Sequence, residues 1–124
     1  MRILVADDDE DIRAVLDIVL GEAGFEVETA ADGVEALDRL RREGTPPGLV
    51  LVDLMMPRLD GEDFVKRMRA DPALSRVPIV VMSGHHEARR RAAELGATEC
   101  LVKPVELDAL MAMVHRYAAV APAE

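Results

Sequence analysis

Acidic side chains follow two short apolar segments of the chain. Asp7 and Asp8 come directly after residues 3–6, and Asp53 comes directly after residues 49–52. Three carboxylates that meet in one crevice repel one another unless a cation lies among them. Hard oxygen ligands in small number suit Mg²⁺, and Mn²⁺ accepts the same ligands. If the two segments end side by side, these residues therefore predict a divalent metal site.

A hydroxyl and an ammonium group follow two further apolar segments. Ser83 comes directly after residues 79–82, and Lys103 comes directly after residues 100–102. A carboxylate that accepts or attacks, a metal ion, a hydroxyl and an ammonium are together the groups that handle a phosphoryl group. We therefore expect phosphoryl chemistry where these segments end.

The short apolar segments alternate with segments of helical periodicity. The apolar segments are residues 3–6, 25–29, 49–52, 79–82 and 100–102. The helical spacing is seen at Ile12, Val15, Leu16, Val19 and Ala23, at Val34, Leu37 and Leu40, at Phe64, Val65 and Met68, at Ala88, Ala92 and Leu95, and at Leu107, Leu110, Met111 and Val114. Such alternation predicts an α/β fold with helices on both faces of a parallel sheet, because each parallel crossover must return over the sheet.

The composition of the expected strands suggests their order. The first, third and fourth are continuous in apolar residues, as in strands buried on both faces, whereas residues 25–28 alternate as in an edge strand. The order 2-1-3-4-5 satisfies this pattern. In that order the chain reverses direction between strands one and three, and doubly wound sheets bind ligands outside the carboxyl ends of the strands at such a point. Asp7, Asp8 and Asp53 are expected there.

The overall composition limits the classes of function. The 124 residues include 24 acidic and 15 basic side chains, for a net charge of −9, and half of the residues are apolar. We expect one soluble domain whose acidic excess disfavours direct contact with nucleic acid. The longest apolar run, residues 109–114, is too short for membrane insertion, and the first residues lack the pattern of a signal peptide. A cytoplasmic location is therefore expected.

Four short motifs lie at the carboxyl ends of the expected strands. They are ILVADD at residues 3–8, DLMMP at 53–57 with DG at 60–61, VMSG at 81–84, and KP at 103–104. With these motifs in this order, the chain resembles the receiver domain of bacterial two-component response regulators over essentially its whole length. The resemblance implies a flavodoxin-like doubly wound fold of five βα units for residues 1–117. Residues 118–124 are expected to be a flexible tail or the start of a linker.

The resemblance implies a role for each acidic residue of the motifs. Asp53 matches the aspartate that accepts a phosphoryl group from a histidine kinase. Asp8 and Asp53 would bind Mg²⁺ directly, and Asp7 would act mostly through a bound water. The backbone carbonyl of Met55 would be a further ligand.

The remaining motif residues are expected to hold and protect the phosphoryl group. Lys103 would pair with phosphoryl oxygens, and Ser83 would turn inward to hydrogen-bond one of them. The Lys103–Pro104 bond matches the cis peptide of the family. Met55 and His85 match the variable positions that flank the phosphoryl group, where they would shield it and slow its hydrolysis.

The resemblance also implies partners. The phosphoryl donor would be a sensor histidine kinase or a histidine phosphotransfer protein, and the output would be a downstream protein or an effector domain. A phosphorylation-dependent homodimer would form through the fourth helix, the fifth strand and the fifth helix. The domain would act as a switch and not as a turnover enzyme.

Cys100 stands where many relatives have an aromatic residue that moves with the hydroxyl of Ser83. We expect Cys100 to be buried as a small apolar residue, and the signal to travel through movement of the fourth helix. That helix has few apolar residues, and its residues 89–91 are arginines that either face solvent or dock an acidic partner or a second subunit.

Several residues have simpler interpretations. Asp9, Glu10 and Asp11 are expected to cap the first helix, and Asp60 the third. His85 and His86 are expected to face solvent.

Two other functions fit parts of the sequence. A Mg²⁺-dependent phosphohydrolase of the haloacid dehalogenase type uses two aspartates at the spacing of Asp7 and Asp9 after its first strand. A receiver-like interaction module would act without phosphorylation, although the acceptor, metal and lysine positions are all filled here.

Overall fold

The computed structural model describes residues 1–42, 46–84 and 87–119. In these residues, five strands and five helices alternate along the chain, which confirms the predicted α/β pattern. They are β1 (Arg2–Ala6), α1 (Glu10–Glu22), β2 (Glu26–Ala30), α2 (Gly33–Arg42), β3 (Leu49–Asp53), α3 (Gly61–Ala70), β4 (Ile79–Ser83), α4 (Ala88–Leu95), β5 (Glu99–Val102) and α5 (Leu107–Ala119).

The sheet has the predicted strand order β2-β1-β3-β4-β5, and every pair of neighbouring strands is parallel. All residues of β3 and β4 are buried, whereas β2 at the edge is partly exposed. The register pairs Ala6 with Val52, and Ser83 with Val102. All five strands therefore end at one edge of the sheet, and the chain reverses direction between β1 and β3.

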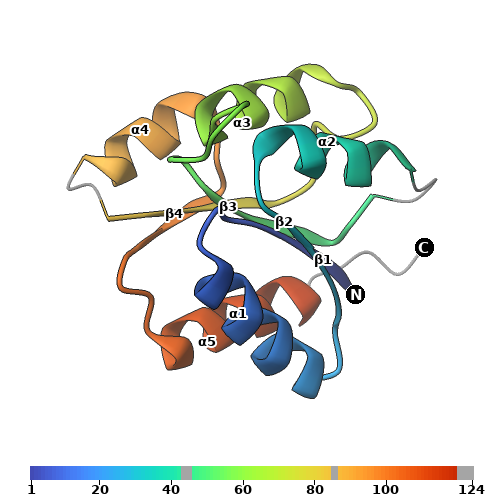
Figure 1. Cartoon of the computed structure of the whole chain (residues 1–124), viewed down its shortest axis with the longest axis vertical. Helices are drawn as coiled ribbons and strands as arrows, with labels where there is room; N and C mark the ends of the chain where they lie inside the picture. Colours follow the sequence, from blue (N-terminus) through green and yellow to red (C-terminus); the bar gives the residue numbers. More distant parts are fainter. Residues whose placement is uncertain (43–45, 85–86, 120–124) are drawn as a thin grey trace.

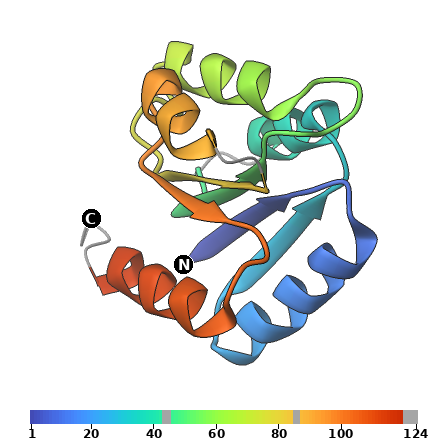
Figure 2. The same cartoon turned by 90° about the vertical axis from the view of Figure 1, so that its left-hand side faces the viewer.

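Two helical layers cover the sheet. In Figures 1 and 2, α1 and α5 lie on one face, and α2, α3 and α4 lie on the other. Because side chains alternate along a strand, β3 supplies both hydrophobic clusters: Val50 and Val52 face α2 to α4, and Leu49 and Leu51 face α1 and α5. The rigid sheet edge that positions the site is thus packed from both sides.

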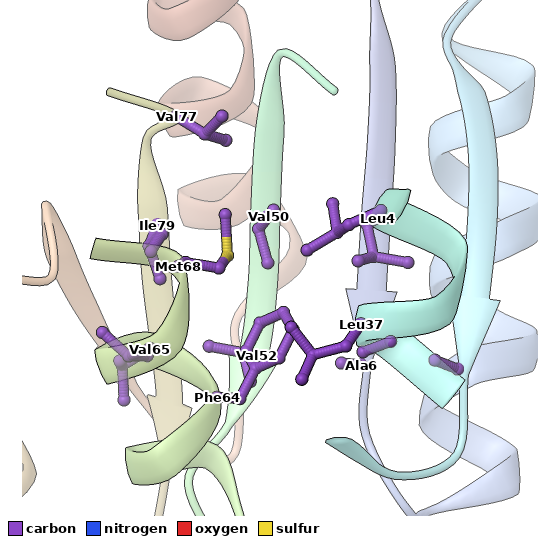
Figure 3. Packing of buried hydrophobic residues seen from close by; sticks show 14 of the residues in the cluster. Leu4, Ala6, Leu37, Val50, Val52, Phe64, Val65, Met68, Val77 and Ile79 are labelled. Atoms are coloured by element: carbon purple, nitrogen blue, oxygen red, sulfur yellow. The ribbon is translucent and has the colours of Figure 1, made fainter. Parts of the chain in front are cut away.

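The packing of α3 on the sheet is seen in Figure 3. Phe64 lies over Val52, and Met68 lies beside Val50 and Ile79. None of these side chains is exposed to solvent. This packing fixes the start of α3, which follows the loop after Asp53.

The sequence predicted the helices correctly but misassigned part of their buried faces. Val15, Val34 and Leu107 were expected inside, and they are 45%, 41% and 41% exposed. Other residues are buried in their helices, namely Leu20, Ala36 and Met113. A helix turns about 100° per residue, so a contact face displaced by one residue still satisfies the apolar spacing.

Cys100 is partly exposed, although we expected it to be buried. It lies on β5, which is an edge strand, and packs against the cluster under α4. Its partial burial raises the pKa of the thiol, and the positive charge of nearby Arg89 opposes this.

Aspartates begin three helices. Asp9 accepts hydrogen bonds from the amides of Asp11 and Ile12, as predicted for this cap. Asp60 accepts one from the amide of Asp63, which confirms the second predicted cap. In addition, Asp32 accepts one from the amide of Glu35 at the start of α2. None of the helices in the described ranges has the length and hydropathy of a membrane span.

Candidate functional site

The predicted site residues come together at the carboxyl edge of the sheet. Asp7 directly follows β1, Asp53 and Ser83 are the last residues of β3 and β4, and Lys103 directly follows β5. The buried strands bring these residues together from distant parts of the sequence. Ser83 is 2% exposed at this edge.

Three carboxylates form the centre of the site. Asp7, Asp8 and Asp53 each offer one oxygen atom, and these atoms lie within 4.8 Å of one another. Asp7 is fully buried, Asp53 is 5% exposed, and Asp8 is open to solvent. The Asp9 amide donates to Asp7 Oδ1 at 2.9 Å, and the Met55 amide donates to Asp53 Oδ1 at 2.9 Å. The backbone thus fixes both buried carboxylates.

Lys103 joins the two buried carboxylates. Its Nζ lies 2.9 Å from Asp7 Oδ2 and 3.0 Å from Asp53 Oδ2. The Lys103–Pro104 peptide bond is cis, which is the conformation that the resemblance implied. The ammonium therefore lies close enough to Asp53 to contact an oxygen of a group attached to the Asp53 carboxylate.

Burial and charge shift the pKa of these groups. Burial raises the pKa of the Asp53 carboxyl, and the neighbouring Asp7 charge adds to this, while the Met55 amide and Lys103 oppose it. Burial alone would lower the pKa of Lys103, but its bonds to Asp7 and Asp53 raise it. Lys103 is therefore protonated at neutral pH.

The donor set fits a divalent cation. The three carboxylates together with the ammonium of Lys103 leave two negative charges without compensation when all are ionised. Carboxylate oxygens are the ligands that Mg²⁺ and Mn²⁺ prefer. The exposure of Asp8 leaves one side of the cluster accessible from solvent. The cluster could therefore hold such an ion.

A groove opens beside the cluster. Its volume is about 920 Å³, and its lining includes Asp8, Met55 and Ser83 together with residues of α4 such as Ala88 and Arg91. The Met55 side chain is 73% exposed at this groove. The other position expected to flank the phosphoryl group, His85, lies outside the described residues, as does His86.

Two residues that support the site were not recognised from the sequence as doing so. Arg13 of α1 donates from Nη1 to the carbonyl oxygen of Asp7 at 2.7 Å, and no pattern in the sequence indicated this contact. Gly61 donates its amide to Leu54, and a Cβ at Gly61 would lie 2.3 Å from the carbonyl oxygen of Asp53. Gly61 stands in a recognised motif, and its lack of a side chain lets α3 start this close to Asp53.

Comparison with known families agrees with this geometry. The family model of the response regulator receiver domain matches residues 3–115. The chain belongs to this family. The receiver domain thus has the fold and function class that the motifs indicated, as part of two-component signalling.

Relatives of the receiver domain include proteins with different functions. It is 34% identical to sporulation initiation phosphotransferase F of Bacillus subtilis, over 94% of this chain and 92% of that protein. It is 45% identical to the transcriptional regulatory protein PrrA of Mycobacterium tuberculosis, over 91% of this chain and 48% of that protein. The structure of the chemotaxis response regulator CheY4 of Vibrio cholerae superposes with a TM-score of 0.85 and 33% identity, over 94% of this chain and 97% of that one.

The receiver domain is only a part of many relatives. The chain spans about half of the length of several curated relatives, and 29% of a protein-glutamate methylesterase of Anaeromyxobacter dehalogenans. Receiver domains of this family therefore occur both fused to other domains and in proteins of about this length.

Proposed function

We propose that this receiver domain accepts a phosphoryl group on Asp53 and thereby changes the partner that it binds. The observation that supports this most directly is the placement of the Lys103 ammonium, 3.0 Å from Asp53 Oδ2 at the edge of the acidic cluster. A buried carboxylate beside an ammonium and further oxygen ligands matches the needs of phosphoryl transfer, which are positioning and charge neutralisation.

The phosphoryl donor would be a phosphorylated histidine of a sensor kinase or of a phosphotransfer protein. A carboxylate oxygen of Asp53 attacks the phosphorus, so that the P–O bond forms while the P–N bond to the imidazole breaks. The imidazole leaves with the electron pair of that bond and takes a proton. Lys103 then pairs with a phosphoryl oxygen, and the hydroxyl of Ser83 donates a hydrogen bond to another.

The metal ion would be Mg²⁺, with Mn²⁺ as a substitute. Asp8, Asp53 and the backbone carbonyl of Met55 would hold it directly, and Asp7 would do so through a bound water. When bound, it neutralises charge on the phosphoryl oxygens as the transfer proceeds.

Met55 and His85 would set the lifetime of the phosphorylated state by shielding it from water. The high exposure of Met55 at the groove beside Asp8 agrees with contact to a group that projects from Asp53. An unchanged dephosphorylation rate in Met55→Asn and in His85→Ala would refute this role.

The domain would work in the cytoplasm as residues 1–117, with residues 118–124 as a tail or linker, and without direct contact to nucleic acid. Its phosphorylated form would pair with a second copy through α4, β5 and α5. Sedimentation of the phosphorylated and unphosphorylated protein tests this pairing. A phosphorylated protein that remains monomeric would exclude it. It would act as a switch and not as a turnover enzyme.

The phosphohydrolase alternative is disfavoured by Asp9. Its carboxylate accepts hydrogen bonds from two amides at the start of α1, so it serves as a helix cap. The phosphorylation-independent module is disfavoured because the acceptor, metal and lysine positions are all present and in contact.

Intact mass after incubation with acetyl phosphate tests the proposal. We expect one phosphoryl adduct that requires both Mg²⁺ and Asp53, and that is lost in Asp53→Asn. The matched control is Asp38→Asn, which removes an exposed carboxylate on α2 and should leave the adduct intact. A folded wild-type protein without an adduct would refute the acceptor role.

A further inference from the structure

Arg58 has an unusual backbone conformation close to the site. Its φ is 67°, and it is the one non-glycine residue with positive φ in the described part of the chain. A side chain makes this left-handed region unfavourable, because Cβ approaches the following carbonyl oxygen. Arg58 lies in the loop between β3 and α3, which begins directly after Asp53. Some contact must therefore stabilise the loop in this left-handed backbone conformation.

That contact comes from Asp32 at the start of α2. Arg58 donates a hydrogen bond from Nε to Asp32 Oδ2 at 2.9 Å, and its Nη2 lies 2.7 Å from the same oxygen in an ion pair. Asp32 is 8% exposed, and its Oδ1 accepts a hydrogen bond from the amide of Glu35 at 2.8 Å. Burial alone would raise the pKa of Asp32, but the Glu35 amide and the Arg58 guanidinium lower it below its usual value. A fixed and ionised carboxylate therefore anchors Arg58.

A backbone hydrogen bond also joins these two loops, between the residues that directly follow Asp32 and Arg58. The amide of Gly33 donates to the carbonyl oxygen of Leu59 at 3.1 Å. A Cβ at Gly33 would lie 2.1 Å from that oxygen, so only glycine permits this approach. The tip of the β3–α3 loop is thus anchored to the start of α2 by an ion pair and a backbone hydrogen bond.

The other end of this loop belongs to the acidic cluster. The Met55 amide donates to Asp53 Oδ1 at 2.9 Å, and the Gly61 amide closes the base of the loop on the carbonyl of Leu54 at 3.0 Å. Met55 lies three residues before Arg58. The course of the backbone at Arg58 therefore restricts where the Met55 carbonyl can lie.

We propose that Asp32 and Arg58 are positioning residues for the divalent metal site, because they hold the β3–α3 loop so that the Met55 carbonyl lies beside Asp53. The inference rests on the proposed function in one respect, which is that the Met55 carbonyl is a metal ligand. Neither residue would touch the metal, and both would act through the loop. Outer contacts of this kind orient the ligands of metal sites.

Charge and positioning predict opposite effects of removing Arg58. Arg58→Ala takes one positive charge from the neighbourhood of the site, so electrostatics alone would strengthen the binding of a cation. The positioning role predicts weaker cation binding. Alanine at this position still has the unfavourable left-handed conformation but lacks the ion pair with Asp32. The direction of the change thus separates the two effects.

The experiment is a titration of the whole chain with Mg²⁺, followed through the backbone amide signals by NMR. We expect Arg58→Ala to weaken Mg²⁺ binding roughly tenfold, as is usual for outer contacts of metal ligands. Arg58→Lys, which keeps the charge and can reach Asp32, should restore most of the affinity. Arg58→Gly should lie between them, since glycine accepts positive φ without strain.

The matched control is Arg39→Ala, which removes an arginine paired with Glu35 on the adjacent helix and leaves the loop alone. It should bind Mg²⁺ as the wild type does. If folded Arg58→Ala binds Mg²⁺ as tightly as the wild type or more tightly, the positioning role is overturned. If Arg58→Ala does not fold, the same result in Arg58→Gly would overturn it. No Mg²⁺ binding by the wild type, or unchanged binding in Asp53→Asn, would overturn the proposed metal site as well.

Discussion

Lys103 is the side chain that balances the buried carboxylates of the site. Its Nζ lies within 3.0 Å of oxygens of both Asp7 and Asp53, which are almost inaccessible to solvent. Buried carboxylates without a partner are costly, and a divalent cation would take over part of the role of the ammonium.

We therefore expect Lys103→Ala to lower the free energy of unfolding by about 2 kcal/mol without Mg²⁺, since a buried charged acceptor loses its donor. The loss should be smaller in Mg²⁺. Urea unfolding with and without the ion measures both values. Lys66→Ala is the control, because Lys66 is exposed on α3. Equal stability of both variants without Mg²⁺ would contradict this account.

Tyr117 offers a prediction for pH dependence. Burial, together with its hydrogen bond to Glu99 Oε2 at 2.5 Å, raises the pKa of this phenol to about 12. An unfolded tyrosine titrates near pH 10, so the contact stabilises the fold below about pH 10 and this contribution is lost as the pH rises toward 12.

The chain has one tyrosine and no tryptophan, so phenolate absorbance reports on Tyr117 alone. We expect a midpoint near 12 for the wild type and a lower one for Glu99→Gln. Circular dichroism of the same samples shows whether the chain is still folded. A midpoint near 10 in folded protein would show that the contact is absent in solution.

The sequence was sufficient to predict which residues lie together at the carboxyl edge of the sheet, and insufficient to predict the residues that support them. Asp7, Asp53, Ser83 and Lys103 were found because each stands where a continuous apolar strand ends. The pairing of Asp32 with Arg58 joins residues 26 apart in two loops. Neither their spacing nor their residue types indicate that those loops touch.

At the scale of elements, α4 is weakly anchored. It has eight residues, no side-chain hydrogen bond at its N-cap, and small buried residues at Ala88 and Ala92 beside Leu95. Its main polar contact to α3 is the pair of bonds from Arg91 to Glu62, at 2.8 and 2.5 Å. A helix with few apolar contacts opens at low free energy.

Arg91→Ala should therefore increase amide hydrogen exchange in residues 88–95, because α4 loses its link to α3. Mass spectrometry of peptides after deuterium labelling measures this. Arg89→Ala, on the exposed side of the same helix, should leave the exchange rates nearly unchanged. Equal protection in both variants would mean that apolar packing alone holds α4.

The elements themselves were easier to predict than their orientation. Strands buried on both faces consist of uninterrupted apolar residues, so β1, β3 and β4 were predicted together with their order. Helix faces depend on the rotation of each helix over the sheet, which the local pattern does not fix. Val15 and Leu107 were therefore placed inside although they are exposed.

At the scale of the whole molecule, the net charge of −9 and the acidic cluster together favour cation binding. An ion that binds only the folded chain stabilises it, by about 2.7 kcal/mol at a hundredfold excess over its dissociation constant. Magnesium should raise the melting temperature, and a chelator should reverse the increase.

Asp8→Asn should abolish most of this stabilisation, since Asp8 is the exposed member of the cluster. Asp11→Asn, which removes another exposed carboxylate nearby on α1, is the control for general charge effects. Differential scanning calorimetry of the three proteins gives the comparison. An equal response of all three to Mg²⁺ would indicate diffuse binding to the acidic surface.

Asp53 is the residue that we propose as the acceptor of the phosphoryl group. Reduction of an aspartyl phosphate with borohydride converts the aspartate to homoserine, which marks its position in the chain permanently. We would therefore treat the protein with acetyl phosphate and Mg²⁺, reduce it, and sequence its peptides by tandem mass spectrometry. We expect homoserine at position 53 alone. Homoserine at Asp7, Asp8 or another carboxylate, with aspartate retained at position 53, would contradict it.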